Sequence, residues 1–327
     1  MKRDNGSSFA VESENSVFRS KKKSFRISSD LFFAFLVRSA GLLTFLLVFL
    51  FFVLMIYQGL RVFEFISPSD LLFSETGGTR VYEWYPVSQD PRFSVVPLIV
   101  GTLLTAIPAT LISTIFGVGT GVYISEFASP ALRRSLKNLI DLFASLPTVA
   151  VGFIFLTVVA TFFSDLFNPA SRLNAALSAL GLSLIIIPQI ASLTGDALRA
   201  VPRETRLAAY SLGAGKWRTV KDVVLPAAGN GISAGIILGF GRAIGDTMIV
   251  LMISGNADNL VLDPFSSVRT MTATIAAELG EVSPGTAHFH ALFFIGLLLF
   301  LMSIILNLIV RALVKRFTGG KKEARSV

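Results

Sequence analysis

A charged pair lies inside one of the most apolar stretches of this chain. Arg242 and Asp246 are the two charged residues of the run 227–253, which otherwise contains apolar, small and uncharged polar side chains. If the run crosses a membrane as one helix, residues four positions apart share a face. Ionised side chains are costly in hydrocarbon, so such a pair is a functional candidate by default. An alternative interpretation is that the pair only holds two helices together.

Three glycines surround this pair, at Gly239, Gly241 and Gly245. Glycine removes side-chain bulk, which lets helices approach each other closely or leaves room for a solute. The combination of charge and small residues therefore indicates a solute pathway as one interpretation of this run.

A second stretch, residues 200–226, is basic and has the signals of two short helices. Pro202 suits a first helical turn, and Gly213 and Gly215 permit a sharp turn between the helices. Pro226 is expected to end the second helix. Apolar residues recur at helical spacing, namely Leu207, Ala208, Tyr210 and Leu212, then Trp217, Val220 and Val224. A hairpin of this size cannot fold alone, so the pattern predicts a docking surface for another protein, with an ordinary surface hairpin as the alternative.

Two other patterns resemble a nucleotide-binding motif and a metal site, but neither has the complete set of residues. Residues 210–217 lack the first Gly and the Ser/Thr of a phosphate-binding P-loop, because Tyr210 and Trp217 occupy those positions. This stretch therefore gives the chain no ATP-binding site of its own. His288 and His290 have metal-like spacing, but no carboxylate or Cys stands beside them and the chain contains no Cys. We expect interfacial histidines, no catalytic residue, no metal and no cofactor.

The composition is that of a membrane protein. Of the 327 residues, 53% are hydrophobic and 15% are charged, against roughly a quarter charged in soluble domains. The formal charge of +8 is not read as a nucleic-acid signal, because the basic residues lie in tails and alternate loops. The apolar runs predict six spans of about the ~20 residues that a bilayer requires, at about 40–56, 95–117, 142–163, 175–193, 227–253 and 291–313.

The basic residues also predict the orientation of these spans. Of the 29 Lys and Arg residues, 23 lie in the tails and loops on the side of the N-terminus, five lie in the opposite loops, and Arg242 lies in a span. Cytoplasmic loops carry the excess of Lys and Arg. Both termini and the stretch 200–226 are therefore expected in the cytoplasm. Residues 1–29, which are polar, Ser-rich and basic, are expected to form a disordered cytoplasmic tail.

The stretch 200–226 resembles the coupling loop of ABC-importer permeases. That loop has Glu-Ala-Ala, three residues, Gly, nine residues, an aliphatic residue, one residue and Leu-Pro. The matching residues are Ala208, Ala209, Gly213, Val223, Leu225 and Pro226. Leu207 departs from the pattern, since it stands where the family usually has Glu.

The fifth predicted span narrows this resemblance. The sequence of residues 241–248, followed by Gly255-Asn256, is similar to that of PstC-type permease subunits of phosphate-specific ABC importers. Asp246 stands where that family typically has Glu. Further similarity lies in Trp84–Pro86, in Ser145–Val149 and in Thr270–Glu278, and the resemblance covers roughly residues 90–316.

The resemblance implies an all-α membrane protein with six transmembrane helices, the type I ABC importer permease fold and cytoplasmic N and C termini. Residues 30–92 would form the first transmembrane helix and an extracytoplasmic loop. Residues 93–316 would form the permease core, including the coupling loop 201–226, and residues 317–327 a cytoplasmic tail. Its place would be the bacterial cytoplasmic (inner) membrane.

The resemblance also implies a transport subunit rather than an enzyme. Such a subunit pairs with a PstA-type permease as a heterodimer, and a dimer of PstB-type ATPases docks on the coupling loops. A PstS-type phosphate-binding protein, periplasmic or lipid-anchored, delivers phosphate from outside. ATP binding and hydrolysis switch the pathway between outward and inward access. Membrane lipid surrounds the complex, and no nucleic acid is expected as a partner.

Within this family, Arg242 is expected to face the translocation pathway and to contact phosphate. A guanidinium offers fixed, bidentate donors that match an oxyanion. Asp246 suits the role of its resting partner, and Thr247 can add a hydroxyl. The ATPase-coupling loop is assigned to Ala208, Ala209, Gly213, Trp217, Leu225 and Pro226.

Alternative functions remain open at this point. Permeases for sulfate, molybdate or phosphonate share the coupling loop, although the fifth span favours phosphate. A secondary transporter would need no ATPase, and the coupling stretch argues against it. A phosphate-sensing membrane component is the third possibility.

Overall fold

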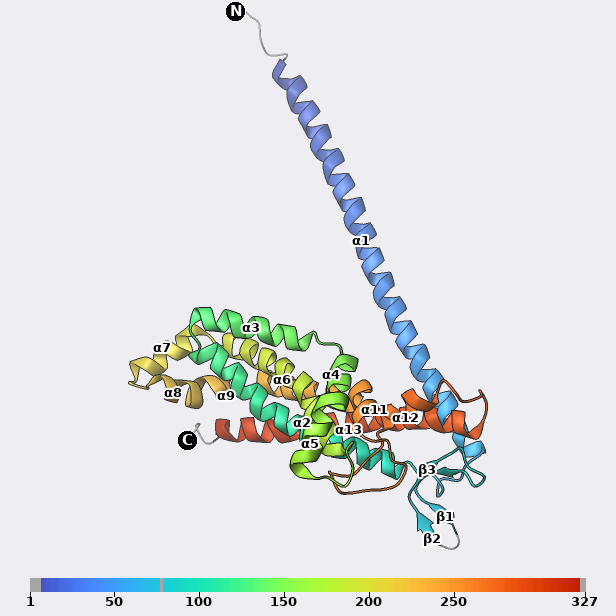
Figure 1. Ribbon diagram of the computed structural model, residues 1–327. Helices are drawn as coiled ribbons and strands as arrows, with labels where there is room; N and C mark the ends of the chain where they lie inside the picture. The colour runs from blue at the N-terminus through green and yellow to red at the C-terminus, as the bar shows by residue number, and fades with distance from the viewer. Residues whose placement is uncertain (1–6, 77–78, 324–327) are drawn as a thin grey trace, which may run out of the picture. The chain divides into compact units, whose positions relative to one another are not determined.

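The computed structural model describes residues 7–76 and 79–323, and this part of the chain is built of helices with two short β-ribbons (Figure 1). Contacts divide the chain into two compact units, residues 1–57 and 58–327. Nearly all of helix α1 (Ser7–Leu60) belongs to the first unit, and its apolar, membrane-spanning part begins at Phe33. The disordered tail expected over residues 1–29 stays a prediction.

The second unit begins with a segment of short strands. After the 3₁₀ turn η1 (Arg61–Glu64), β1 (Ser74–Thr76) pairs antiparallel with β2 (Thr79–Val81), and β3 (Trp84–Tyr85) pairs antiparallel with β4 (Arg92–Phe93). In the second ribbon the aromatic rings of Trp84 and Phe93 pack edge to face. The loop predicted between the first two spans therefore has ordered secondary structure.

The remaining elements of the second unit form a helix bundle. Three π-helical segments interrupt it, each continuous with α-helix on at least one side. The elements are, in chain order, α2 (Val96–Val122), η2 (Tyr123–Phe127), α3 (Pro130–Ala144), α4 (Thr148–Ile154), η3 (Phe155–Val159), α5 (Ala160–Phe167), α6 (Ala175–Arg199), α7 (Arg203–Ser211), α8 (Lys216–Thr219), η4 (Val220–Val224), α9 (Leu225–Ala227), α10 (Gly229–Gly245), α11 (Met248–Ile253), α12 (Met271–Glu278) and α13 (Ala287–Glu323).

Side-chain caps explain several of these helix starts. The side chains of Ser129, Asn174 and Thr270 accept hydrogen bonds from the amides of Leu132, Leu177 and Ala273. Each bond satisfies one of the amides that a first helical turn leaves without a partner.

Helix α6 lies at the centre of the bundle core, with Ile186 and Ile190 fully buried. Glycines let the neighbouring helices approach α6 closely. A Cβ at Gly117 of α2 would lie 2.8 Å from the Ile190 Cβ, and a Cβ at Gly239 of α10 would lie 2.9 Å from the Ile186 Cγ2. Because lipid tails are as apolar as Leu, such close packing, rather than burial from water, holds helices together in a membrane.

Within the residues that the structure describes, five helices are long and apolar enough to cross a membrane. A sixth crossing results if Lys216–Ala227 and Gly229–Gly245, which meet at 68°, form one broken span. The mostly helical fold agrees with the prediction, and the predicted number of six spans is reached if the bent pair counts as one span. The prediction of one continuous helix over residues 227–253 is wrong in detail, because α10 ends at Gly245 and α11 begins at Met248.

Within the second unit, the β-ribbons and the α7–α8 hairpin lie at opposite ends of the bundle (Figure 1). Helix α2 starts directly after β4 and runs away from it, and α6 returns toward α7. The predicted docking stretch leads through α9 into α10, and α10 carries Arg242.

Candidate functional site

Arg242 lies on α10, one turn beyond the glycine that packs against α6. Its guanidinium Nη1 donates a hydrogen bond to Gln189 Oε1 of α6 at 3.3 Å. Among the residues whose side chains are described, Gln189 is its one hydrogen-bond partner, and Arg242 takes part in no ion pair there. The guanidinium is therefore held by a neutral amide, and its charge is not balanced by a contacting carboxylate.

Asp246 does not form the expected ion pair with Arg242. Its backbone is extended (φ −70°, ψ 132°), and its Oδ1 accepts a hydrogen bond from the Ile249 amide at 3.0 Å, in the first turn of α11. The Asp246 carbonyl accepts a second bond from Thr272 Oγ1 at 3.0 Å. In this conformation the Asp246 carboxylate bonds the first turn of α11 and not the guanidinium, and its role as the resting partner of Arg242 stays a prediction.

One strip of α10 is only partly covered in the described part of the chain. Leu238, Arg242 and Gly245 follow each other at helical spacing on one face. Leu238 is 54% exposed, and a Cβ at Gly245 would find nothing within 4 Å. We call these three residues the α10 strip. Gly239 lets α10 pack closely against α6, whereas Gly245 leaves open space beside the helix. Each of these two glycines thus fits one of the two roles predicted from the sequence, close helix packing and room for a solute.

Thr247 follows Asp246 in the break between α10 and α11, where it is half-buried. Its backbone occupies the position before the first turn of α11, but its side chain does not cap that turn. The structure therefore brings Arg242, Asp246 and Thr247 to one end of α10 and gives them different surroundings.

Gln189 is the residue of this site that the sequence did not single out. It follows Pro188 inside α6, in a stretch where the flanking isoleucines are buried. A polar amide in an apolar span was the available signal, but nothing in the sequence links it to Arg242, which lies 53 positions further on.

The second candidate region is the α7–α8 hairpin, and it has the predicted helix–turn–helix form. Gly213 adopts φ +78°, a left-handed conformation that favours glycine. Gly215, at φ −69°, does not need one. Pro226 does not end the second helix as predicted, because it lies in the first turn of α9 and the chain stays helical to Ala227.

Contacts with the ends of α2 and α6 hold this hairpin in place. The Arg206 guanidinium pairs with Glu126, which is 8% exposed, and also donates to the Leu198 carbonyl at 2.7 Å. The Trp217 and Phe127 rings lie 6.0 Å apart, and Lys216 Nζ lies 5.2 Å from the centre of the Phe127 ring. The hairpin is thus a fixed projection of the bundle.

Several apolar side chains of the hairpin are exposed. Leu212 is 89% exposed and Trp217 is 63% exposed, and Leu207 and Tyr210 are also exposed. Of the other residues assigned to the coupling loop, Ala208 and Gly213 are exposed, Leu225 and Pro226 are half-buried, and Ala209 is buried. Exposed apolar patches of this kind mark protein–protein contact sites.

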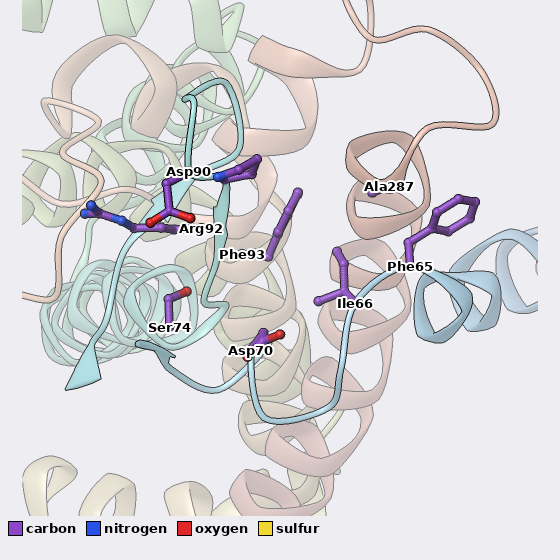
Figure 2. A pocket seen from close by; sticks show the side chains of 9 residues that line it. Phe65, Ile66, Asp70, Ser74, Asp90, Arg92, Phe93 and Ala287 are labelled. Atoms are coloured by element: carbon purple, nitrogen blue, oxygen red, sulfur yellow. The ribbon is translucent and has the colours of Figure 1, made fainter. Parts of the chain in front are cut away.

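The other end of the bundle carries a cavity of about 440 Å³ between β4, the segment after η1 and the start of α13. In Figure 2, Ser74, Asp90 and Arg92 lie on one side of the view and Phe65 and Ile66 on the other. The lining includes the carboxylates Asp70 and Asp90, and the one cation, Arg92, pairs with Glu83. Its charges therefore disfavour a dianion.

Glu278 joins three segments near this cavity. Its carboxylate accepts from Trp84 Nε1 at 3.0 Å and from Arg269 Nη1 at 2.8 Å, and it lies 2.8 Å from His288 Nε2. His288 is half-buried and His290 is 1% exposed, so both pack within this end of the unit, and their position at a membrane interface stays a prediction. No group of three or more metal-ligating side chains occurs in the part that the structure describes.

Comparison with known proteins identifies the family of this chain. Residues 113–319 match the family described as binding-protein-dependent transport system inner membrane component. The chain is 31% identical to the probable ABC transporter permease protein YqgH of Bacillus subtilis (strain 168), over 77% of this chain and 79% of that protein. It is 34% identical to the phosphate transport system permease protein PstC of Pasteurella multocida (strain Pm70), over 74% of this chain and 80% of that protein.

Solved structures share the fold. A bacterial ABC transporter involved in the import of the acidic polysaccharide alginate superposes with a TM-score of 0.60 at 13% identity, over 92% of this chain and 99% of that chain. The MetNI methionine ABC transporter, in an inward facing conformation, gives a TM-score of 0.51 at 17% identity, over 69% of this chain and 97% of that chain. At these identities the likeness concerns the fold alone.

Proposed function

The chain belongs to the family of binding-protein-dependent transport system inner membrane components, and we propose that it imports inorganic phosphate as the permease subunit of an ATP-driven importer. Membership makes it a multi-pass transport subunit of the cytoplasmic membrane rather than an enzyme. Relatives named as phosphate permeases, identical at about a third of positions over three quarters of the chain, support the choice of phosphate.

The surroundings of Arg242 are the main support for this proposal. Its charge persists at any physiological pH, and an isolated Arg at the membrane centre costs ~3 kcal/mol or more. Its contacting partner is the neutral amide of Gln189. An anion in the pathway offsets this cost by accepting two parallel N–H···O bonds from the guanidinium. The open α10 strip gives such an anion access to Arg242.

The partners follow from the family and from the open surfaces. A PstA-type permease covers the α10 strip and supplies further positive charge, since one Arg only partly balances a phosphate dianion. A dimer of PstB-type ATPases docks on the α7–α8 hairpin, and a PstS-type binding protein delivers phosphate at the end that carries the β-ribbons. Both termini lie in the cytoplasm, as the Lys and Arg distribution indicates.

The fold suggests how ATP drives the transport. The hairpin continues through η4 and α9 directly into α10. Movement of the hairpin with its ATPase therefore displaces the helix that carries Arg242. The hairpin side and α10 meet at a bend of 68°, so a movement of the hairpin would reach α10 in a different direction.

The test is phosphate uptake by the whole importer with Arg242→Gln. We expect uptake to be abolished while the assembled complex and its ATPase remain, because Gln offers no positive charge. Arg242→Lys should restore uptake only in part, since an ammonium lacks the bidentate geometry. Normal uptake by Arg242→Gln, or loss of the complex from the membrane, would contradict the assignment.

Competition by sulfate, molybdate and a phosphonate in the same assay separates phosphate from the other oxyanions. Each should leave phosphate uptake unchanged at equal concentration. Stronger inhibition by one of them than by unlabelled phosphate would make that anion the substrate.

A further inference from the structure

The resting partner of Arg242 is a neutral side chain in a chain that has carboxylates nearby. Asp246 lies four positions further on, yet its carboxylate bonds the Ile249 amide of α11. The Arg242 guanidinium instead reaches across to α6, where Gln189 Oε1 accepts its hydrogen bond at 3.3 Å. A neutral acceptor fixes the direction of a guanidinium without cancelling its charge.

Gln189 comes from the most constrained part of the bundle. Its neighbours Ile186 and Ile190 are fully buried, and both lie where a Cβ at Gly239 of α10 would meet them. Gln189 lies on α6 and Arg242 on α10, and these two helices pack closely at Gly239, one turn before Arg242. The position of the guanidinium relative to α6 is therefore set by this amide and by that packing.

We infer that Gln189 is a positioning residue that fixes the direction of the Arg242 guanidinium beside α6 and keeps its charge available for the transported anion. This inference rests on the proposed function, in which Arg242 meets phosphate. A hydrogen bond to a neutral amide is weaker than one to an ion. An arriving phosphate therefore displaces the amide readily, and the amide takes the guanidinium back when phosphate leaves.

A carboxylate at position 189 would have the opposite effect. It would form a charge-assisted, bidentate pair with Arg242 and compete with phosphate for the same donors. Gln189→Glu makes this change with almost no change in size. An apolar residue of similar length, Gln189→Met, removes the acceptor without adding a competing charge.

The experiment measures phosphate uptake against phosphate concentration, with the whole importer in proteoliposomes and with the amount of assembled complex and its basal ATPase as references. For Gln189→Glu we expect KM to rise by about tenfold or more, which corresponds to ~1.4 kcal/mol of competing interaction. For Gln189→Met we expect a rise of about threefold, because the free guanidinium samples more directions. Gln89→Glu, the same substitution at an exposed glutamine between β3 and β4, is the control and should leave KM unchanged.

The outcomes separate this inference from the proposed function. A wild-type KM in Gln189→Glu overturns it, and so does an equal loss in Gln189→Glu and Gln189→Met, which would indicate a purely structural role. If Gln189→Glu fails to assemble, Gln189→Met decides alone, since an unchanged KM there contradicts positioning. If Arg242→Gln still imports phosphate, the proposed function itself fails, whatever the result at position 189.

Discussion

Gly213 and Gly215 look alike in the sequence, yet their backbones make different demands. Gly213 adopts φ +78°, whereas Gly215 adopts φ −69°, and a Cβ at either position would meet nothing within 4 Å. Any penalty for a side chain at Gly213 therefore comes from the backbone and not from crowding. The pair provides a matched test of the turn.

We expect Gly213→Val to uncouple ATP hydrolysis from transport, because a β-branched residue is strongly disfavoured at positive φ. A side chain at positive φ costs about 1–2 kcal/mol of backbone strain. The turn should therefore distort, and the phosphate imported per ATP hydrolysed should fall several-fold. The measurement is the ratio of phosphate uptake to phosphate-stimulated ATPase. Gly215→Val is the control and should leave the ratio near that of the wild type. Normal coupling in Gly213→Val would show that the ATPase does not depend on this turn.

Local patterns singled out Arg242 in the fifth span but not its hydrogen-bond partner. An Arg in an apolar run is visible in any sequence, because its cost in hydrocarbon does not depend on the fold. The partner depends on which helix lies beside α10, and this contact joins residues 53 positions apart. Spacing alone favoured Asp246, whose carboxylate the helix break turns away.

At the scale of elements, hydropathy located most spans because each is a single apolar run. Helix α6 begins at Ala175 as predicted, and α2 begins within one residue of its predicted start. The break between α10 and α11 was not predicted, since it is stabilised by a hydrogen bond from Thr272 of α12 to the Asp246 carbonyl. Such a long-range bond leaves no mark in the periodicity of the span itself.

Glu278 is the point at which β3, the segment before α12 and the start of α13 are joined. We expect Glu278→Gln to lower the melting temperature of the purified complex, because an amide cannot accept from Trp84, Arg269 and His288 as a carboxylate does. Leaving buried donors without a partner costs roughly 1–3 kcal/mol each. Glu281→Gln, three residues further on and exposed, is the control and should melt like the wild type. Equal melting temperatures in both variants would mean that this junction adds no stability.

At the scale of the whole molecule, the Lys and Arg asymmetry predicts that the chain ends in the cytoplasm. A fluorescent protein that folds only in the cytoplasm, fused after Val327, should fluoresce. The same protein inserted after Gln89, in the loop expected outside, should stay dark. Alkaline phosphatase at the two positions should give the reverse pattern, since it is active only outside. Phosphatase activity after Val327 would overturn the orientation and with it the docking of an ATPase on the α7–α8 hairpin.

The exposed apolar surface of the α7–α8 hairpin also bears on how long the chain survives in a cell. Leu212 and Trp217 remain mostly exposed in the described chain. A copy synthesised without its ATPase displays this patch continuously, and uncovered apolar surface promotes aggregation and marks chains for removal. We therefore expect the lifetime of the subunit to follow the supply of its ATPase, so that proteolysis of orphan copies, rather than matched synthesis, sets the ratio of the subunits.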